Sequence, residues 1–168
     1  ARVLWQMRRS LYAPLPRLDI PPGVTIRAFQ PGVDDEEWLA LNAAAFVNLP
    51  DQGAWTRTDL ERRLAEPWFD PNGFLIAERN GQMIGFHWTK LHGGAAHDPI
   101  GEVYVLGIDP SERGTGLGRV LTLAGLHHLR SLQLAQVMLY VDATNTSAIG
   151  VYEGLGFARW DTDVMYRR

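Results

Sequence analysis

A glycine-rich segment between a strand and a long helix constrains this chain more than any other feature. Residues Glu102–Ile108 are predicted to form a strand, and apolar residues at helical spacing predict a helix over Gly114–Leu132. The junction between them reads Arg113-Gly114-Thr115-Gly116-Leu117-Gly118. A second apolar stretch, Val137–Val141, follows the helix. The order strand, helix, strand predicts a crossover connection and local parallel pairing.

Glycines at the start of a helix let the backbone come close to an anion. The free amides of the first helical turn and the helix dipole then favour phosphate. The segment is not a Walker loop, because no Gly-Lys-Ser/Thr follows it. It also differs from the dinucleotide fingerprint, which lies in an early strand–helix turn. A tight turn that only serves close helix–strand packing is the structural alternative, and a nucleotide-binding module is another.

The remaining segments extend this pattern to a mixed α/β sheet flanked by helices. Asn80-Gly81 between two apolar runs predicts a hairpin, hence antiparallel pairing there. Residues 93–99 are expected to form a loop. The predicted order is β-α-α-β-β-β-α-β-α-β-β, with strands and helices at 25–29, 34–46, 56–64, 74–79, 82–91, 102–108, 114–132, 137–141, 146–155, 157–160 and 163–166.

The first 22 residues differ in character from the rest of the chain. Residues Ala1–Leu11 contain a short apolar stretch and then Arg8-Arg9, and four prolines lie from Pro14 to Pro22. We predict that residues 1–22 are the last strand of a preceding module and a linker, and that residues 23–168 are one domain. The start has neither the basic nor the apolar region of a signal peptide, and the chain is expected to be cut from a longer protein.

Composition excludes several classes of function. With a net charge of −3, the chain lacks the basic excess typical of nucleic-acid binding. No apolar run approaches the roughly 18 residues of a membrane span. Cysteine is absent, which rules out disulfides, thiolate metal sites and a cysteine nucleophile. The histidines have no ligand spacing, so we expect no metal site, and we expect a cytoplasmic protein.

A second motif is more specific than the glycine loop. Residues Asn145–Phe157 follow the spacing Asn-x-x-Ala-x-x-x-Tyr-x-x-x-Gly-Phe. Together with Arg-x-x-Gly-x-Gly about thirty residues earlier, the motif resembles the Gcn5-related N-acetyltransferase superfamily. The order of strands and helices is also that of the superfamily, and the resemblance covers residues 25–166.

This resemblance implies acetyl-coenzyme A as the acetyl donor. It implies that backbone groups of Leu106, Gly107 and Ile108 pair with the pantetheine arm and polarise the acetyl carbonyl. Gly107 also suits a bulge that separates neighbouring strands. The glycine loop would cradle the pyrophosphate, and the implied cofactor contacts are Arg113, Gly114, Thr115, Gly116, Leu117, Gly118, Arg119 and Asn145.

Acetyl transfer to an amine needs a base for the amine proton and a donor for the leaving thiolate. Tyr152 is the candidate acid, since a phenol stays protonated at neutral pH; the alternative is a core tyrosine. Glu102 is the candidate base, acting directly or through water; the alternative is a solvated residue at a strand start. Without cysteine, direct transfer in a ternary complex is expected.

Further segments resemble the mycothiol synthase family, in which two acetyltransferase modules are joined in tandem and the second is active. These segments are Glu66–Pro71, Gly85–Lys90, Gly101–Val105 and Leu139–Asp142. This resemblance implies acetylation of the cysteine amine of cysteinyl-glucosaminyl-inositol, with Glu102 as base and Tyr152 as acid. The implied substrate contacts are Asp51, Lys90, Glu102 and Tyr140. Two alternatives stay open: another small amine or a protein N-terminus as acceptor, and a module that binds acetyl-coenzyme A without turnover.

Overall fold

The protein forms a seven-stranded mixed sheet with helices on both faces. The computed structural model describes residues 2–94 and 97–165. The strand order is β2-β3-β4-β5-β6-β1-β7, and β5 and β6 form its one parallel pair among the described strands. The strands are β1 (Arg2–Ser10), β2 (Val24–Ala28), β3 (Phe74–Arg79), β4 (Gln82–Gly94), β5 (His97–Ile108), β6 (Gln136–Asp142) and β7 (Ala158–Met165).

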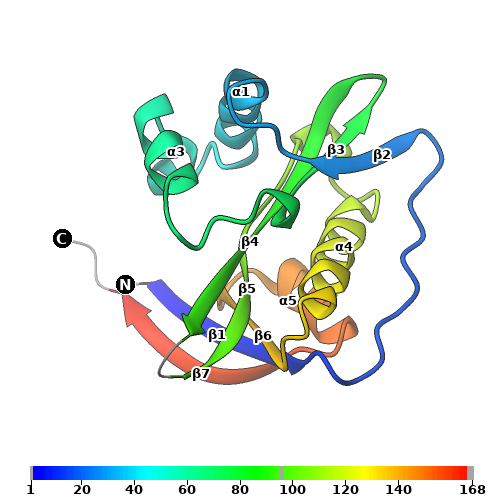
Figure 1. The fold of residues 1–168 in the computed structure, drawn as a ribbon, viewed down its shortest axis with the longest axis vertical. Helices are drawn as coiled ribbons and strands as arrows, with labels where there is room; N and C mark the ends of the chain where they lie inside the picture. Colours follow the sequence, from blue (N-terminus) through cyan, green and yellow to red (C-terminus); the bar gives the residue numbers. More distant parts are fainter. Residues whose placement is uncertain (1, 95–96, 166–168) are drawn as a thin grey trace.

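Two groups of helices cover the sheet (Figure 1). One face carries α1 (Asp35–Ala45) and α3 (Arg57–Leu64), with the short α2 (Pro50–Gly53) between them in sequence. The other face carries α4 (Leu117–Ser131) and α5 (Thr146–Gly154). Two single turns, Pro71–Gly73 and Pro110–Glu112, precede β3 and α4. The mixed sheet and its flanking helices confirm the predicted fold class.

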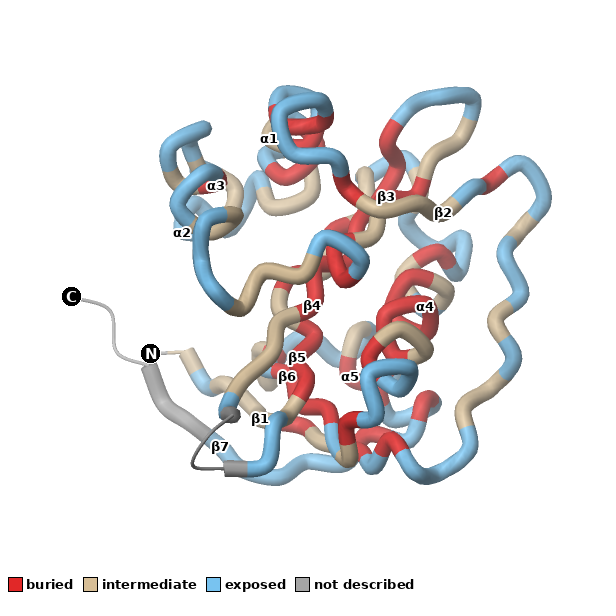
Figure 2. The backbone as a smooth tube through the Cα atoms, in the orientation of Figure 1, coloured by how far each residue is buried: buried red, intermediate tan, exposed pale blue. Residues whose placement is uncertain are grey.

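Each face of the sheet has its own hydrophobic core. Under α4 and α5 the core is mainly aliphatic, whereas under α1 and α3 it is aromatic. Trp88 is central to the aromatic core, where its ring stacks on Phe74 at 4.2 Å and meets Trp38 edge-on at 5.9 Å. Figure 2 shows buried residues concentrated along the central strands and the inner side of α4, while the segment leading to β2 is mostly exposed.

The strand β1 lies between β6 and β7 and pairs antiparallel with both. Its Met7 is 1% exposed and belongs to the core under α4 and α5. The first strand of the chain therefore completes the sheet of the domain that follows it. Its origin in a preceding module stays a prediction.

Two sequence-based assignments at the ends of strands were wrong. Of the expected loop over residues 93–99, the described residues 93–94 and 97–99 lie in strands: β4 continues to Gly94 and β5 begins at His97, because the two strands keep pairing at His92↔Ile100 and Gly94↔His97. The two final strands are one strand, β7, whose register shifts opposite Gln6 and Met7. Tyr166, the expected end of the last strand, lies outside the described residues.

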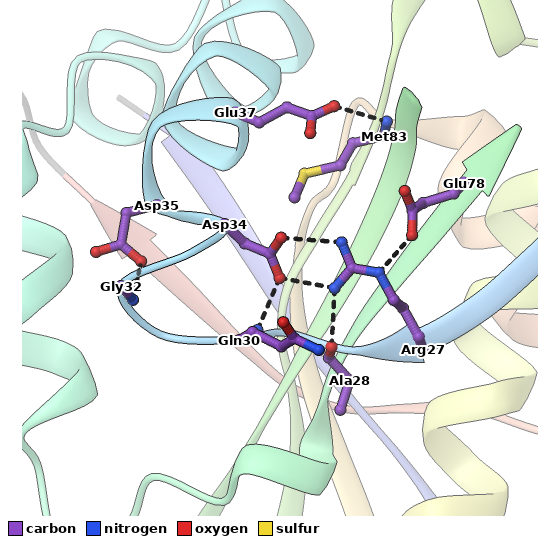
Figure 3. Close-up of polar contacts among 9 residues, drawn as sticks. All are labelled: Arg27, Ala28, Gln30, Gly32, Asp34, Asp35, Glu37, Glu78 and Met83. Carbon is purple, nitrogen blue, oxygen red and sulfur yellow. Dashed lines mark hydrogen bonds and ion pairs between the residues drawn. The ribbon is translucent and has the colours of Figure 1, made fainter. Parts of the chain in front are cut away.

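An ion-pair cluster fixes α1 to the edge of the sheet (Figure 3). Arg27 on β2 donates Nη1 to Asp34 Oδ2 at 2.7 Å and Nη2 to Asp34 Oδ1 at 2.9 Å, and its Nε contacts Glu78 on β3. The bond to Arg27 lowers the pKa of the Asp34 carboxyl. From the start of α1, Glu37 accepts a hydrogen bond from Met83 N at 3.0 Å. These contacts orient the helix that leads to Phe46.

Candidate active site

The parallel strands β5 and β6 separate after only three residue pairs. Gly101–Val103 pair with Val137–Leu139, and neither strand pairs with the other beyond Val103. On the opposite edge of β5, Val103 pairs with Thr89 and Val105 with Trp88, so Tyr104 is an extra, bulged residue. The separation thus begins at the bulge and opens a space between the strands.

The bulge was predicted at Gly107, and this was wrong. Gly107 pairs with Phe86 in the regular register. A Cβ atom at Gly107 would lie 2.4 Å from Cε1 of Phe86. Close packing against that ring, rather than a bulge, is what requires glycine there.

Two cavities meet at the separation of the strands. The larger has a volume of about 800 Å³ and the smaller about 410 Å³. Both are lined by the same five residues from α1, β5 and α5 and the loops that flank them: Phe46, Leu106, Asn145, Ala148 and Tyr152. A molecule bound in one cavity is therefore in reach of a molecule bound in the other.

The smaller cavity is built around the glycine loop. Gly114 has φ +80° and Gly116 has φ +85°, so α4 begins at Leu117 rather than at the predicted Gly114. The first amides of a helix have no intrahelical partner, and Gly116, the N-cap of α4, supplies no side-chain cap to satisfy them. The loop contributes Arg113, Gly114, Gly116, Leu117, Gly118 and Arg119 to the cavity wall, and β5 contributes Leu106, Gly107 and Ile108.

The smaller cavity suits a diphosphate, because it offers free backbone amides, the dipole of α4 and the exposed side chains of Arg113 and Arg119. Thr115 is the one loop residue of the predicted set that does not line the cavity. Its hydroxyl donates to Glu112 O at 2.7 Å and closes the turn before α4. Asn145 also has a structural task, since its side chain accepts from Ala148 N at 3.2 Å and caps α5.

Tyr152 lies where the two cavities join. It is 8% exposed and packs edge-on against Phe157 with ring centroids 5.8 Å apart. Burial raises the pKa of the Tyr152 hydroxyl to about 12. The phenol is therefore protonated throughout the neutral range and can donate a proton to a group at the junction.

The larger cavity has polar walls. Asp51 lines it from α2, and Tyr140 and Asp142 line it from β6. Tyr140 is 47% exposed and accepts a hydrogen bond from Gln6 Nε2 at 3.4 Å. Arg2 of β1, which the sequence did not single out, lines the same cavity.

Glu102 and Lys90 face each other in the β4–β5 register but line neither cavity. Lys90 Nζ lies 4.7 Å from the ring centroid of Trp68 and 5.0 Å from that of Tyr104. Tyr104 lines the larger cavity, so this cluster is adjacent to the cavity through that ring. The Glu102 side chain is 9% exposed and contacts Nε2 of His92.

His92 was missed by the sequence because the β4–β5 hairpin was expected to end before it. Its pairing partner is Ile100, which brings its ring diagonally across from Glu102. In the described part of the chain no three of the His, Asp and Glu side chains form a group able to hold a metal ion. No helix in that part is long and apolar enough to cross a membrane.

The fold, the glycine loop at a helix start and the tyrosine at the cavity junction define an acyl-transfer domain. The model of the acetyltransferase (GNAT) family matches residues 36–157, and the chain belongs to this family. It is a module of the acetyl-CoA-dependent N-acetyltransferase class.

Curated relatives narrow the class further. The mycothiol acetyltransferase of Thermobispora bispora is 65% identical over 170 residues, which cover 100% of this chain and 58% of that protein. The mycothiol acetyltransferase of Thermomonospora curvata is 60% identical over 167 residues, which cover 99% of this chain and 55% of that protein. The chain thus spans just over half the length of these relatives.

Solved structures share the fold. A GCN5-related N-acetyltransferase from Sphaerobacter thermophilus superposes with a TM-score of 0.74 at 25% identity, covering 96% of this chain and 49% of that one. A chain of the NatC complex bound to Gag peptide and CoA superposes with a TM-score of 0.68 at 17% identity. The match covers 82% of this chain and 86% of that one. The likeness to the NatC chain concerns the fold alone.

Proposed function

We propose that this module transfers the acetyl group of acetyl-CoA to the cysteine amine of cysteinyl-glucosaminyl-inositol, which yields mycothiol. One observation carries the proposal: Tyr152, protonated and buried, lies where a loop-lined cavity meets a larger polar one. The relatives named mycothiol acetyltransferase support this acceptor.

Acetyl-CoA binds in the smaller cavity in this proposal. The pyrophosphate accepts hydrogen bonds from the free amides at the start of α4, and Arg113 and Arg119 offset its charge. The pantetheine arm runs along Leu106–Ile108, on the edge of β5 that β6 leaves unpaired. The thioester then reaches the junction beside Tyr152.

The acceptor binds in the larger cavity with its amine at the same junction. The amine nitrogen attacks the thioester carbonyl carbon, the C–N bond forms, and the C–S bond breaks. The sulfur takes the proton of the Tyr152 hydroxyl, which a proton from solvent replaces before the next turnover, and Glu102 takes the amine proton through water. His92, in contact with Glu102 and 37% exposed at its side chain, then carries that proton to solvent.

Asp51 and Tyr140 supply hydrogen bonds to the sugar and inositol hydroxyls. Lys90, held between two aromatic rings, supports the cavity wall at Tyr104 and is a further acceptor contact. We also propose that residues 1–22 are the last strand of a preceding acetyltransferase module and a linker, and that residues 23–168 are the domain that follows. The reaction is placed in the cytoplasm, where acetyl-CoA is made and used.

The experiment is a thiol-release assay with acetyl-CoA, comparing cysteinyl-glucosaminyl-inositol with a panel of simple amines and an N-terminal peptide. Turnover at least tenfold faster with the pseudodisaccharide is expected. Faster turnover with another amine would replace the acceptor but keep the mechanism. Calorimetric binding of acetyl-CoA without any turnover would identify a silent module, and would overturn the proposed activity.

A further inference from the structure

We propose that Arg2 and Asp142 form a polyol-binding pair in the larger cavity and determine which acceptor the site selects. This inference rests on the proposed function, since it names the part of the acceptor that the cavity recognises. It adds two residues, one of them from the first strand of the chain.

The pair joins two strands that lie far apart in sequence. Arg2 on β1 donates Nε to Asp142 Oδ2 on β6 at 3.2 Å, and both residues line the larger cavity. Neither lines the smaller cavity. The side chains are 36% and 28% exposed, so the pair is open to a ligand that enters the larger cavity.

Asp142 is held in one orientation before any ligand binds. Its Oδ1 accepts from Thr144 N at 2.9 Å and from Thr144 Oγ1 at 2.7 Å. These bonds and Arg2 lower the pKa of the Asp142 carboxyl, so it is ionised at neutral pH. Oδ2 keeps one lone pair beyond its bond to Arg2.

The guanidinium of Arg2 also keeps free donors. Its bond to Asp142 uses Nε, and within the described residues Nη1 and Nη2 have no hydrogen-bond partner. The pair therefore presents two donor nitrogens, which carry four N–H groups, beside a carboxylate acceptor. Adjacent hydroxyls of a sugar or inositol each donate one bond and accept another, which matches this arrangement.

The charge of the cavity selects a neutral polyol over an anion. Among the described residues, the ionisable side chains on its wall are the carboxylates of Asp51 and Asp142, one cation, Arg2, and the phenols of Tyr104, Tyr140 and Tyr152. Two carboxylates against one guanidinium disfavour an acceptor that carries a carboxylate or phosphate. A glycosylated inositol has no such charge.

The test compares two acceptors that share the reacting cysteine amine. Cysteinyl-glucosaminyl-inositol carries the polyol and cysteinamide lacks it. Arg2→Gln is expected to raise KM for the pseudodisaccharide roughly tenfold, the loss of one charge-assisted hydrogen bond. The kcat with that acceptor and the KM for cysteinamide and for acetyl-CoA are expected to stay within about twofold.

Asp142→Asn is the milder second variant, because its amide oxygen can still accept from Thr144. It is expected to shift the same KM in the same direction. Arg17→Gln is the matched control, since Arg17 lies in the linker with an 88% exposed side chain. It is expected to leave every kinetic constant unchanged.

A binding measurement separates this inference from the proposed reaction. Calorimetry with N-acetylglucosaminyl-inositol, which keeps the polyol but lacks the cysteine and its amine, is expected to show binding to the parent chain and at least tenfold weaker binding to Arg2→Gln. Equal affinities, or an equal KM rise for both acceptors, would overturn the polyol pair and leave the proposed function intact. Binding without turnover would overturn the function and keep the pair.

Discussion

At the residue scale, Tyr152 has the two properties that a general acid needs at neutral pH. Its hydroxyl carries a proton, because burial raises its pKa to about 12, and it lies at the junction of the two cavities. The edge-on contact with Phe157 holds the ring in place.

Replacing Tyr152 by phenylalanine is expected to lower kcat on the order of 10²-fold, because the thiolate must leave without a proton. Affinity for acetyl-CoA is expected to stay within about twofold, since the ring remains. A discontinuous thiol-release assay measures kcat, and calorimetry measures the affinity for acetyl-CoA. Tyr12→Phe, at a tyrosine that is 76% exposed, is the control, and an unchanged kcat in Tyr152→Phe would remove the proposed acid.

Glu102 is the second residue whose chemistry can be isolated. Glutamine at this position cannot accept the amine proton, so kcat/KM is expected to fall about 10²-fold. Steady-state thiol release by Glu102→Gln measures this. Glu66→Gln, at an exposed glutamate, should keep the parent kcat/KM, and an unreduced kcat/KM in Glu102→Gln would point to a different base.

At the element scale, the start of α4 depends on one backbone conformation. Gly116 has φ +85° with open space around its Cα, so the constraint is the left-handed conformation rather than crowding. Gly116→Ala is expected to lose about 1–2 kcal/mol of unfolding free energy and to weaken acetyl-CoA binding, because the amides shift. Urea unfolding and calorimetry measure both effects.

The matched control is Gly150→Ala in α5. Gly150 also has open space around it, but its φ is not positive. Alanine there is expected to stabilise the helix by up to about 1 kcal/mol and to leave binding unchanged. If both variants behaved alike, the backbone conformation at Gly116 would not matter.

The packing of β4 on α4 buries a histidine. His87 is fully buried, its Nδ1 donates to Leu121 O at 2.8 Å, and Gly125 leaves room for its ring. Burial lowers the pKa of His87 to about 4, with a smaller contribution from His128. Between pH 4 and pH 6.5, His87 binds a proton in the unfolded chain, where its pKa is near 6.5, but stays neutral in the folded chain.

The contribution of neutral His87 to the free energy of unfolding is therefore expected to be fully present above pH 6.5. The free energy of unfolding is expected to fall by about 3 kcal/mol between pH 6.5 and pH 4. Urea unfolding at both pH values measures this loss. In His87→Gln the loss over that range is expected to be smaller, since glutamine does not titrate. His127→Gln should keep the parent slope, and a slope unaltered by His87→Gln would assign the loss to other groups.

At the scale of the whole molecule, Arg9 joins three segments. Arg9 is 7% exposed, and within the described residues its guanidinium donates only to carbonyl oxygens: Leu155 O at 2.6 Å, Ser10 O at 2.8 Å, Ala13 O at 3.1 Å and Pro14 O at 3.3 Å. It thereby ties β1 and the linker to the end of α5, the helix that carries Tyr152.

Arg9→Lys is expected to lower the unfolding free energy by about 2 kcal/mol, because one ammonium cannot reach carbonyls that the planar fork spans. Thermal and urea unfolding measure the loss. Arg17→Lys, in the exposed part of the linker, should change stability by less than about 0.5 kcal/mol. Equal stabilities of the two variants would show that the linker is held by other contacts.

The sequence by itself determined most of the local structure and singled out most of the residues that line the smaller cavity. Periodic apolar residues predicted the helices and the central strands, since that periodicity reflects which side of each element is buried. The glycines of Arg113–Gly118 and the motif Asn145–Phe157 predicted the loop and the tyrosine that the structure brings into the wall of one cavity. Their functional roles stay predictions.

Only the tertiary structure decided which distant strands are neighbours. The insertion of β1 between β6 and β7, the bulge at Tyr104 and the contact of His92 with Glu102 all depend on sheet register. Register is set by pairing across many residues, so no local pattern encodes it. For the same reason the ion pair of Arg2 and Asp142, 140 residues apart, appears only when the sheet is assembled.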